Sequence, residues 1–431
     1  MSRAMKDSEV EWIGEIPENW VKIKLKKVVC QIDSGGTPSA GNELFYCESG
    51  VPFVNIADMT KNRIIFETKK CLTEDGVADK NLKVYPVGTI LYSIYASIGK
   101  VAELHVPATI SQAILAITPD ESLINNIYFR YYLTSLEDYV KTISSGTTQM
   151  NLNREKVEKL IVAIPSLSEQ KEIAAFLDEK TNKIESIIDN TKQSIDELKK
   201  YKQALILETV TKGLASDVMM KNSGVEWIGK IPEHWACSKI KYITSLSRGQ
   251  FNHRPRNDER FYDGDYPFIQ TGDVAKANKF VTSYSQTLNE FGKNVSKEFP
   301  KGTLVMTIAA NVGDVAVLDF DSYFPDSVIG FVPNDGYYWN YLYYLFSAMK
   351  PSFVSTAIVS TQLNLNVERV KEMYAPTTAD SSEQQQIADY LDEKCAHIDS
   401  LIADKEKLIG EFETYKKALI FEYVTGKKAV E

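Results

Sequence analysis

The sequence contains one long internal repeat. The segment VEWIGEIPENW at 10–20 recurs as VEWIGKIPEHW at 225–235, an offset of 225 − 10 = 215 residues. Further matches follow in the same order at nearly the same offset: YPVGTILYSI (85–94) with FPKGTLVMTI (299–308), TQMNLN (148–153) with TQLNLN (361–366), and SEQKEIAAFLDEK (168–180) with SEQQQIADYLDEK (382–394). Collinear matches at constant spacing exclude two unrelated domains, so the chain must fold as two copies of one unit.

Each copy begins with a globular stretch. Its apolar runs, such as VPFVNI and TILYSIY, are short, β-rich and separated by glycine, proline and asparagine, which is typical of strands. Helical patterns follow late in each copy, at 124–140 and 337–350. The pattern predicts a mixed α/β (α+β) domain of about 150 residues. The many tyrosines of the two helical segments lie at helical spacing, so we expect them in the core and not on a base-stacking surface.

A long helix is predicted after each globular stretch. Ser166 with Glu169, and Asp380 with Glu383, have the spacing of a capping box. Apolar residues then recur with a heptad-like period, which predicts that helices over 166–214 and 381–431 pair through one seam. The seam residues are Leu177, Ile184, Ile187, Leu198, Leu205, Leu391, Ile398, Leu401, Phe412 and Leu419.

Helix length favours one topology. Some 45 helical residues extend roughly 65 Å, whereas a domain of this size is about 40 Å across. Parallel helices would require the second globular unit to carry the chain back along the whole rod. We therefore expect an antiparallel coiled coil that joins globular units 1–165 and 215–380 through a pseudo-two-fold axis. A rod with two similar units related by such an axis has the shape of a protein that reads two half-sites on a DNA duplex, and its length would limit their separation to about 19 base pairs.

Charge and composition limit the possible partners and cofactors. The net charge is −9, and no part of the chain is basic: residues 1–165 hold 18 basic and 20 acidic residues, and residues 215–382 hold 16 and 18. Any DNA footprint must then come from local loops or from a partner. Five cysteines and four histidines are scattered, so neither a zinc site nor a disulfide framework is expected. No leader or membrane-spanning run is recognisable, which predicts a cytoplasmic protein.

The duplicated layout, the SGGTPS loop (34–39), the GTTQMNLN turn (146–153) and the PSLSEQKEIAAFLD run (165–178) together resemble specificity subunits of type I restriction-modification systems. The resemblance implies that each globular unit reads one half of a split DNA target. It implies that the helices form a spacer that docks two modification subunits, which carry S-adenosylmethionine and methylate adenine. A separate restriction subunit, driven by ATP and Mg²⁺, would cut the DNA.

The residues agree with a non-catalytic role. The chain has no F-x-G-x-G cofactor loop, no N/D-P-P-Y/F methyltransferase turn and no P-loop. We expect it to bind no cofactor itself. Asp33, Asp58 and Asp273 are better explained as turn residues than as parts of a nuclease site.

Candidate DNA contacts in the first unit lie in loops. Glycines in the SGGTPS turn would allow close approach to a phosphate, although an ordinary hairpin explains the turn equally well. Its predicted contacts are Ser34, Gly35, Gly36, Thr37 and Ser39. Correspondence between the copies adds Lys61, Arg63, Ser93, Tyr95, Ser97, Thr147, Thr148 and Gln149.

The second unit carries SRGQFNHRPRNDER (247–260) in place of the glycine-rich turn. The loop combines phosphate-binding charge with side chains able to contact guanine or adenine edges. The alternative is a solvated loop that Asp258 and Glu259 partly neutralise. Its predicted contacts are Arg248, Gln250, Asn252, His253, Arg254 and Arg256, to which correspondence adds Gln270, Thr271, Ala309, Asn311, Ser360, Thr361 and Gln362.

The copies differ in these loops and agree in their helices, which predicts two different half-sites and a non-palindromic target. The EWIGxIPExW motif is expected to serve packing, with Trp12, Trp20, Trp227 and Trp235 as anchors. Three alternatives remain open: a specificity subunit of a fused methylase-nuclease, a scaffold or DNA-mimicking inhibitor, and an undetected enzyme. The arginines of the 247–260 loop argue against a mimic, which should place carboxylates there.

Overall fold

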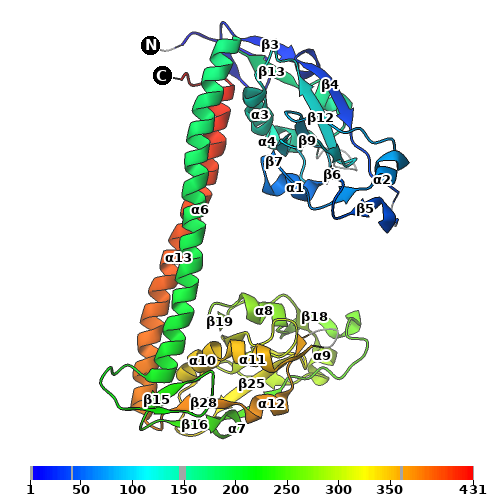
Figure 1. Cartoon of the computed structure of the whole chain (residues 1–431). Coiled ribbons are helices and arrows are strands. Elements are labelled where there is room, and N and C mark those ends of the chain that lie inside the picture. Colours follow the sequence, from blue (N-terminus) through cyan, green and yellow to red (C-terminus); the bar gives the residue numbers. More distant parts are fainter. Residues whose placement is uncertain (1–2, 40–41, 145–151, 360–362, 431) are drawn as a thin grey trace. The chain divides into compact units, whose positions relative to one another are not determined.

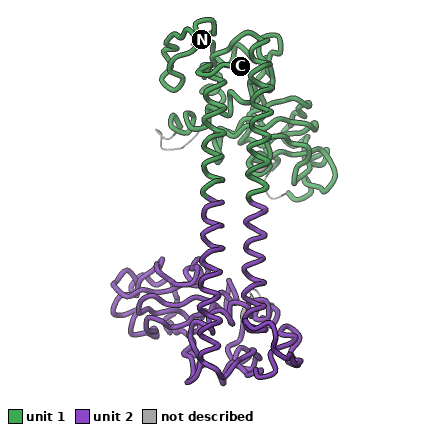
Figure 2. The backbone as a smooth tube through the Cα atoms, turned by 90° about the vertical axis from the view of Figure 1, so that its left-hand side faces the viewer, with its two compact units in different colours: residues 1–191, 407–431 green, residues 192–406 purple. Residues whose placement is uncertain are grey.

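The computed structural model describes residues 3–39, 42–144, 152–359 and 363–430. The chain forms two compact units (Figure 2): residues 1–191 with 407–431 (unit 1), and residues 192–406 (unit 2). Two long helices, α6 (Leu167–Lys212) and α13 (Ser381–Val424), each contribute to both units. Gly213 and Gly426 follow these helices at φ of 74° and 75°, which is the left-handed conformation in which helices commonly end at glycine.

Both units are built on a five-stranded sheet of the same topology. The first four strands are antiparallel neighbours, and the short fifth strand pairs in parallel with the fourth. In unit 1 the spatial order is β4 (Val29–Ser34), β12 (Ile114–Pro119), β9 (Ile90–Ser93), β10 (Val101–Leu104) and β7 (Ile64–Ile65). In unit 2 it is β17 (Thr244–Arg248), β25 (Val328–Pro333), β22 (Leu304–Thr307), β23 (Val315–Leu318) and β19 (Phe280–Val281).

The central strands of each sheet, such as β9 and β22, are buried on both faces, which explains why they read as continuous apolar runs, whereas the edge strands β4 and β17 are partly exposed. Leu115 and Ile117 of β12 pack into the cluster that includes the long helices, whereas Ile114 and Ala116 pack into a separate cluster on the other face. The same division occurs in unit 2, where alternate residues of β22 join different clusters. The core of each unit therefore has two layers, one on either side of the sheet.

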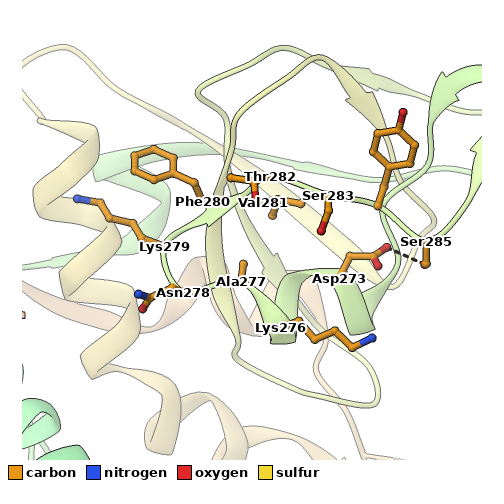
Figure 3. Close-up of a pocket in the computed structure, with 11 residues that line it drawn as sticks. Asp273, Lys276, Ala277, Asn278, Lys279, Phe280, Val281, Thr282, Ser283 and Ser285 are labelled. Atoms are coloured by element: carbon orange, nitrogen blue, oxygen red, sulfur yellow. Dashed lines mark hydrogen bonds between the residues drawn. The ribbon is translucent and has the colours of Figure 1, made fainter. Parts of the chain in front are cut away.

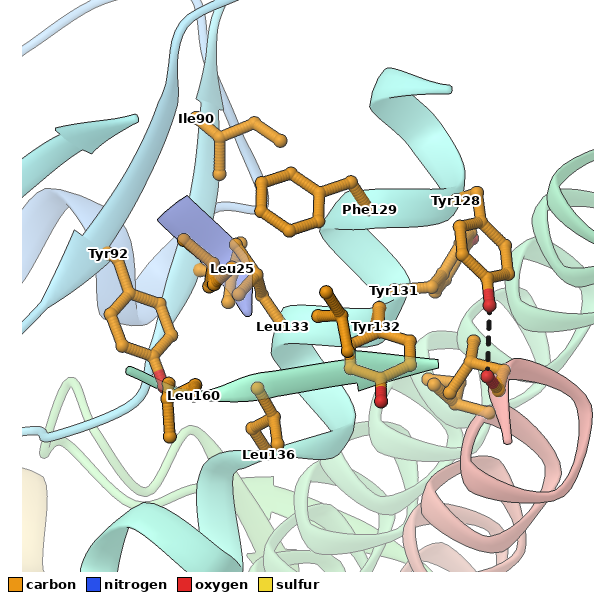
Figure 4. Close-up of a cluster of buried hydrophobic side chains, with 14 of the residues drawn as sticks. Leu25, Ile90, Tyr92, Tyr128, Phe129, Tyr131, Tyr132, Leu133, Leu136 and Leu160 are labelled. Carbon is orange, nitrogen blue, oxygen red and sulfur yellow. Dashed lines mark hydrogen bonds between the residues drawn. The ribbon is translucent and has the colours of Figure 1, made fainter. Parts of the chain in front are cut away.

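On the first face of the unit 1 sheet lies α3 (Asn126–Ser135), between the sheet and α6 (Figure 1). Phe129 and Leu133 of this helix point toward Ile90 and Leu25, whereas Tyr128 points toward the long helices (Figure 4). The Tyr128 hydroxyl lies 3.0 Å from the backbone carbonyl oxygens of both Ala163 and Val424, and burial raises its pKa well above the usual value. The tyrosines of α3 and of α10 (Trp339–Ala348) are buried, which confirms their predicted core role.

On the second face the units differ. Unit 1 has a four-stranded sheet of β11 (Thr109–Ile110), β6 (Val51–Val54), β8 (Cys71–Leu72) and β5 (Tyr46–Cys47). Unit 2 has the pairs β18 (Tyr262–Pro267) with β20 (Thr287–Leu288) and β21 (Glu298–Phe299) with β24 (Ser322–Tyr323). An aromatic cluster around Phe251 and Phe268 fills this layer of unit 2.

Shorter elements complete the two units. In unit 1 these are β1 (Met5–Asp7), β2 (Glu15–Pro17), β3 (Val21–Lys24), α1 (Ile56–Lys61), α2 (Glu74–Asp79), α4 (Glu137–Ser144), α5 (Arg154–Glu158) and β13 (Ile161–Ile164). In unit 2 they are β14 (Met220–Asn222), β15 (Lys230–Pro232), β16 (Ala236–Lys239), α7 (Ile240–Ile243), α8 (Thr271–Lys276), α9 (Glu290–Asn294), α11 (Lys350–Thr356), β26 (Ile358–Val359), β27 (Leu363–Asn364), α12 (Val367–Glu372) and β28 (Tyr374–Thr377).

The tryptophan motif anchors the start of each long helix. Trp20 and Trp235 are buried, and their indole nitrogens donate to Glu169 at 3.2 Å and to Glu383 at 3.0 Å. These glutamates were expected to complete capping boxes. Ser166 does accept from the Glu169 backbone N–H at 3.3 Å, but the glutamate carboxylates bind the tryptophans. The motif therefore serves packing, as predicted.

A buried glutamine next to each glutamate also attaches the start of the long helix to its domain. Gln170 donates to the carbonyl oxygens of Leu123 and Pro165 at 3.1 and 3.0 Å and accepts from the Asn125 backbone N–H at 2.7 Å. Gln384 makes the corresponding three bonds in unit 2, to Gly336, Thr378 and Tyr338. The repeated Ser-Glu-Gln sequence is thus explained by a helix joint made in the same way in both units.

Within each unit the two helices run antiparallel. In unit 1, Phe176 stacks against Tyr423 with ring centres 4.5 Å apart, and Glu185 binds Lys416 at 3.1 Å. In unit 2, Lys202 binds Asp399 at 2.7 Å, whereas Gly213 lies near Glu383. In these contacts, residues later in α6 meet residues earlier in α13.

The predicted seam residues divide into three groups by burial. Leu177, Ile184, Leu391, Ile398 and Leu419 are buried, and Leu198, Leu205 and Phe412 are partly buried. Ile187 and Leu401 were wrongly included, because they are 41% and 37% exposed. Successive helical residues are rotated by about 100°, and the adjacent Ile188 and Ile402 occupy the buried face instead.

Candidate nucleic-acid interface

Several of the predicted DNA loops leave the central sheet at the same end. In unit 1, Ser34 pairs with Leu115, and Ser93 pairs with Ile114, so β4 and β9 end where β12 begins. In unit 2, Arg248 pairs with Ile329 and Thr307 with Val328. We call this end of each sheet its loop end. It brings residues 34–39 together with 93–97, and residues 248–256 together with 307–311.

The SGGTPS turn is packed against its own domain. The Gly35 backbone N–H donates to the Ile114 carbonyl and the Gly36 N–H to the Ile110 carbonyl, both at 3.0 Å. A Cβ on Gly35 would lie 2.2 Å from the Ser111 carbonyl oxygen. An internal chain crossing therefore explains Gly35, whereas a Cβ on Gly36 would meet only the end of the Leu82 side chain, at 2.6 Å. The approach of these glycines to a phosphate stays a prediction. Gly249 has the role of Gly35 in unit 2, where a Cβ would lie 2.3 Å from the Pro325 carbonyl oxygen.

The rest of the turn is also tied down. Thr37 accepts from the Gln112 backbone N–H at 3.4 Å, and Ser39 binds the Asp79 carboxylate through its N–H at 2.9 Å and its hydroxyl at 3.0 Å. The Ser39 N–H lowers the pKa of Asp79. Ser34 and Ser39 remain exposed. The turn thus exposes its serines, whereas its glycines are half-buried.

The next loop has the same framework in both units. The Ser93 hydroxyl donates to the Ser97 carbonyl and accepts from the Lys100 N–H at 2.8 Å. In unit 2 the Thr307 hydroxyl donates to the Asn311 carbonyl and accepts from the Asp314 N–H at 3.2 Å. Both hydroxyl residues are fully buried. Ser93 was therefore wrongly predicted as a DNA contact, because its hydroxyl holds the loop.

The tips of these loops carry strained backbone and different side chains. Ala96 and Ala310 have φ of 58° and 60°, which is unfavourable for any residue except glycine and is often associated with functional sites. Around them stand Tyr95 and Ser97 in unit 1, and Ala309 and Asn311 in unit 2. Tyr95 is 39% exposed. The buried hydroxyl and the backbone conformation of the loop are common to both copies, whereas the exposed side chains at its tip differ.

The 247–260 loop of unit 2 is anchored by one buried aromatic ring. Phe251 is 3% exposed, whereas its neighbours Gln250 and Asn252 are exposed. The backbone N–H groups of Gln250 and Asn252 are held by the carbonyls of Phe324 and Val295 at 2.9 and 3.0 Å. Two amide side chains are therefore presented outward from a fixed backbone.

His253 belongs to the anchor and was wrongly predicted as a DNA contact. Its Nε2 atom lies 2.9 Å from the Asp258 carboxylate, and its ring stacks on Phe261 with centres 4.1 Å apart. Asp258 also binds Arg260, which together with His253 lowers the pKa of the carboxyl. Asp258 therefore neutralises Arg260, one arginine of the loop, as the alternative reading of the loop requires, whereas Arg254 and Arg256 pair with another carboxylate.

The arginines gather around a residue that sequence reasoning missed. Arg248 donates to the Asp326 backbone carbonyl at 2.7 Å, and Arg256 and Arg254 pair with the Asp326 carboxylate, Arg254 at 3.6 Å. The Arg254 and Arg256 side chains are still about half exposed, at 55% and 47%. Asp326 lies one turn before β25, at the position that Gln112 holds in unit 1, so correspondence between the copies could have found it.

The remaining predicted contacts lie elsewhere. Arg63 was predicted to bind DNA, but its guanidinium is bound to α6 through Asn182 at 3.2 Å and Glu185 at 2.6 Å. Gln270 precedes α8, where its N–H is capped by Asp273 at 2.8 Å and its side chain binds Gln286 at 3.0 Å. Asp58 caps α1 in the same way. The prediction of turn residues was therefore wrong in detail, because Asp58 and Asp273 cap helices and Asp33 lies in β4.

Thr271 begins α8, and Lys61 ends α1. The predicted contacts Thr147, Thr148, Gln149, Ser360, Thr361 and Gln362 lie outside the described residues.

A hollow of about 470 Å³ opens beside α8 (Figure 3), lined by Asp273 and residues 276–285. Asp273 accepts there from the Ser285 hydroxyl at 3.1 Å. Within the described ranges, no group of three or more histidine, cysteine, aspartate or glutamate side chains is placed to hold a metal ion, and no described helix is long and apolar enough to span a membrane. The cysteines of this part of the chain are free thiols.

Fold and site together define a duplicated recognition protein, in which one scaffold displays two different sets of loop residues. Residues 17–200 and 232–409 match the type I restriction modification DNA specificity domain. The chain therefore belongs to the family of type I restriction-modification specificity subunits, which are DNA-recognition components and not enzymes.

Known relatives agree with this assignment. The chain is 27% identical to the putative type I restriction enzyme MjaX specificity subunit of Methanocaldococcus jannaschii, over 97% of this chain and 96% of that protein. It is 25% identical to the MjaIX specificity subunit of the same organism, over 61% of this chain and 60% of that protein. A solved chain from a study of type I R-M system assembly and conformational transition superimposes with a TM-score of 0.72 at 15% identity, covering 96% of this chain and 99% of that chain.

Proposed function

We propose that this chain is the DNA-reading subunit of a type I restriction-modification complex, and that it recognises a split, asymmetric target with one half-site per recognition domain. The observation that supports this most strongly is the loop end of the two sheets. A buried hydroxyl fastens the same loop in both units through Ser93 and Thr307, while the exposed tips and the neighbouring loops differ in chemistry. Two copies of one scaffold with different tips would read two different sequences.

The recognition domains in this proposal are residues 1–165 and 215–380, and the spacer is made of segments 166–214 and 381–431, which contain α6 and α13. We propose that these helices pair as an antiparallel coiled coil along their whole length, which the contacts made within each unit support. The 46 residues of α6 extend about 69 Å, or about 20 base pairs of DNA. That length is the upper limit for the separation of the half-sites.

The partners follow from the same proposal. Two adenine methyltransferase subunits would dock on the helices, and restriction subunits would join the full complex. S-adenosylmethionine would be bound by the methyltransferase subunits, and ATP and Mg²⁺ by the restriction subunits, so this chain would hold no cofactor.

Two other functions are less well supported. A specificity subunit that serves a fused methylase-nuclease would have the same features as this chain, and the two functions differ only in the partner protein. A DNA-mimicking inhibitor would display carboxylates at the loop end, but in unit 2 the exposed Arg254 and Arg256 share a single carboxylate, that of Asp326.

The test is to co-express the chain with its neighbouring modification subunit and to map methylated adenines in the host genome. The proposal predicts one motif of two unlike half-sites separated by a fixed number of unspecified bases. A continuous motif, a palindromic motif or the absence of new methylation would contradict it. Methylation or cleavage by the purified chain alone would show that it is an enzyme.

A further inference from the structure

In each unit one acidic residue of a long helix binds both the other long helix and the globular domain. In unit 1, Glu185 of α6 accepts from Arg63 at 2.6 Å and from Lys416 of α13 at 3.1 Å. In unit 2, Asp399 of α13 accepts from Asn278 at 3.1 Å and from Lys202 of α6 at 2.7 Å. We call these the two acidic junctions.

The junctions correspond through the repeat. Glu185 and Asp399 are 214 residues apart, as are Lys202 and Lys416. Arg63 and Asn278 both come from the segment just before the edge strand of the central sheet, β7 in unit 1 and β19 in unit 2. Each junction therefore links the sheet edge of a domain to both helices of its unit. By the register of the edge strand the counterpart of Arg63 is Lys279, which pairs with Asp392 of α13, and Asn278 is the residue before it. The segment that precedes the edge strand is thus linked to the long helices in both units, although through residues at different positions.

The charged residues of the junctions are partly shielded from solvent. Their side chains are between 22% and 36% exposed, so their interactions are screened less than those of fully exposed pairs. Arg63 reinforces its junction with contacts to Thr181 at 3.4 Å and Asn182 at 3.2 Å. Its planar fork of donors suits such a multiple contact.

The junction lies far along the helix from the first attachment of the domain. Trp20 binds α6 at Glu169, 16 residues before Glu185, which is about 24 Å along the helix. Between them, Arg130 of α3 binds Asp178 at 3.1 Å. Of these three contacts with α6, the one made by Arg63 lies farthest from Trp20, and it is made by the edge of the sheet. Arg63 is therefore the best placed of the three residues to resist rotation of the domain relative to its helices.

We propose that Arg63 and Asn278 are positioning residues that fix the tilt of each recognition domain on the helix pair, and that they thereby set which spacings between half-sites the complex accepts. This inference rests on the proposed function. It assigns to Arg63 a role in measuring the DNA target, without contact to any base.

The test uses the complex with its modification subunits and synthetic duplexes. The duplexes carry both half-sites with the native spacer, or with one base pair added or removed, and the initial rate of adenine methylation is measured. For Arg63→Ala we expect the preference for the native spacer to fall by about tenfold, the size expected for losing one charge-assisted hydrogen bond. Rejection of duplexes with altered half-site bases should not change.

Further variants separate positioning from general damage. Arg63→Lys keeps the ion pair and should restore most of the spacer preference. Lys183→Ala removes an exposed pair with Glu179 on the same helix and should have no effect. Glu185→Gln should lower the preference, and adding Arg63→Ala should lower it little further. Asn278→Ala, which breaks a single neutral-donor contact, should act in the same direction more weakly.

Three outcomes would overturn the inference. The first is an Arg63→Ala complex that keeps the wild-type spacer preference. The second is one that loses base discrimination in a half-site, because Arg63 would then contact DNA. The third is one that loses methylation equally at every spacer. A wild-type complex with no split target would instead overturn the proposed function, and this inference with it.

Discussion

At the scale of single residues, the structure reassigns several side chains that looked like DNA ligands. Ser93 and His253 hold loops in place, and Arg63 holds a domain against a helix. Each has an internal partner, such as Glu185 for Arg63. A sequence pattern reports residue type and local spacing, so it cannot distinguish a loop residue that faces DNA from one that faces its own domain. The residues that remain exposed at the loop ends are the remaining candidates for contact with DNA.

A first prediction concerns Gly35. In Gly35→Ala the new methyl group would meet backbone atoms of Ser111 and Ile110 at 2.2 and 2.5 Å, which only a backbone shift could relieve. The free energy of unfolding of unit 1 should fall by about 1–3 kcal/mol, measured by urea denaturation. As the control, Gly410→Ala lies in α13 with open space around it and should raise stability by up to about 1 kcal/mol. An unchanged Gly35→Ala protein would show that the turn is not packed as described.

At the scale of elements, the repeat predicted the mixed α/β domains, the two long helices, their approximate bounds and the packing role of the tryptophan motif. The long helices were predictable because capping residues and heptad spacing are local signals. The second layer was not, because its short strands are defined by pairing partners such as Val54 with Ile110. Asp326 was missed because it stands alone between strands and acquires its arginines only through folding.

The shared loop framework leads to a second prediction. Replacing Tyr95-Ala96-Ser97 by Ala-Ala-Asn, the tip found at 309–311, should leave the thermal midpoint unchanged, because the buried hydroxyl and the backbone conformation are common to both units. The half-site read by unit 1 should change, and the other should not, as measured by mapping methylated adenines. Ser93→Ala is the matched framework variant and should lower the midpoint. An exchanged tip that alters neither half-site would exclude this loop from recognition.

At the scale of the whole molecule, charge is the main constraint. The chain carries a net charge of −9, and Asp326 partly neutralises the arginines of the loop end of unit 2. Affinity for DNA depends on neutralising phosphates. A subunit of this composition is therefore suited to reading sequence within a complex whose other subunits supply most of the positive charge.

A third prediction follows for the isolated chain. It should bind its target weakly, and the dependence of its affinity on salt concentration should be shallow, because few phosphates are neutralised. Titration of the purified chain into labelled duplex at several salt concentrations measures both. Adding the modification subunits should raise the affinity and steepen the dependence. Tight, specific and steeply salt-dependent binding by the chain alone would contradict the prediction.

The central claim is that each unit reads one half-site, and Arg254→Ala tests it most directly. Its guanidinium is half exposed at the loop end of unit 2 and is held by the backbone carbonyls of Phe251 and His253 at 2.6 and 2.8 Å. Methylated adenines should be mapped for the wild-type and Arg254→Ala complexes side by side. One half-site of the motif should be relaxed or altered, and the other half-site and the spacer length should be unchanged. A change in both half-sites, or an equal loss of methylation at all sequences, would contradict the central claim.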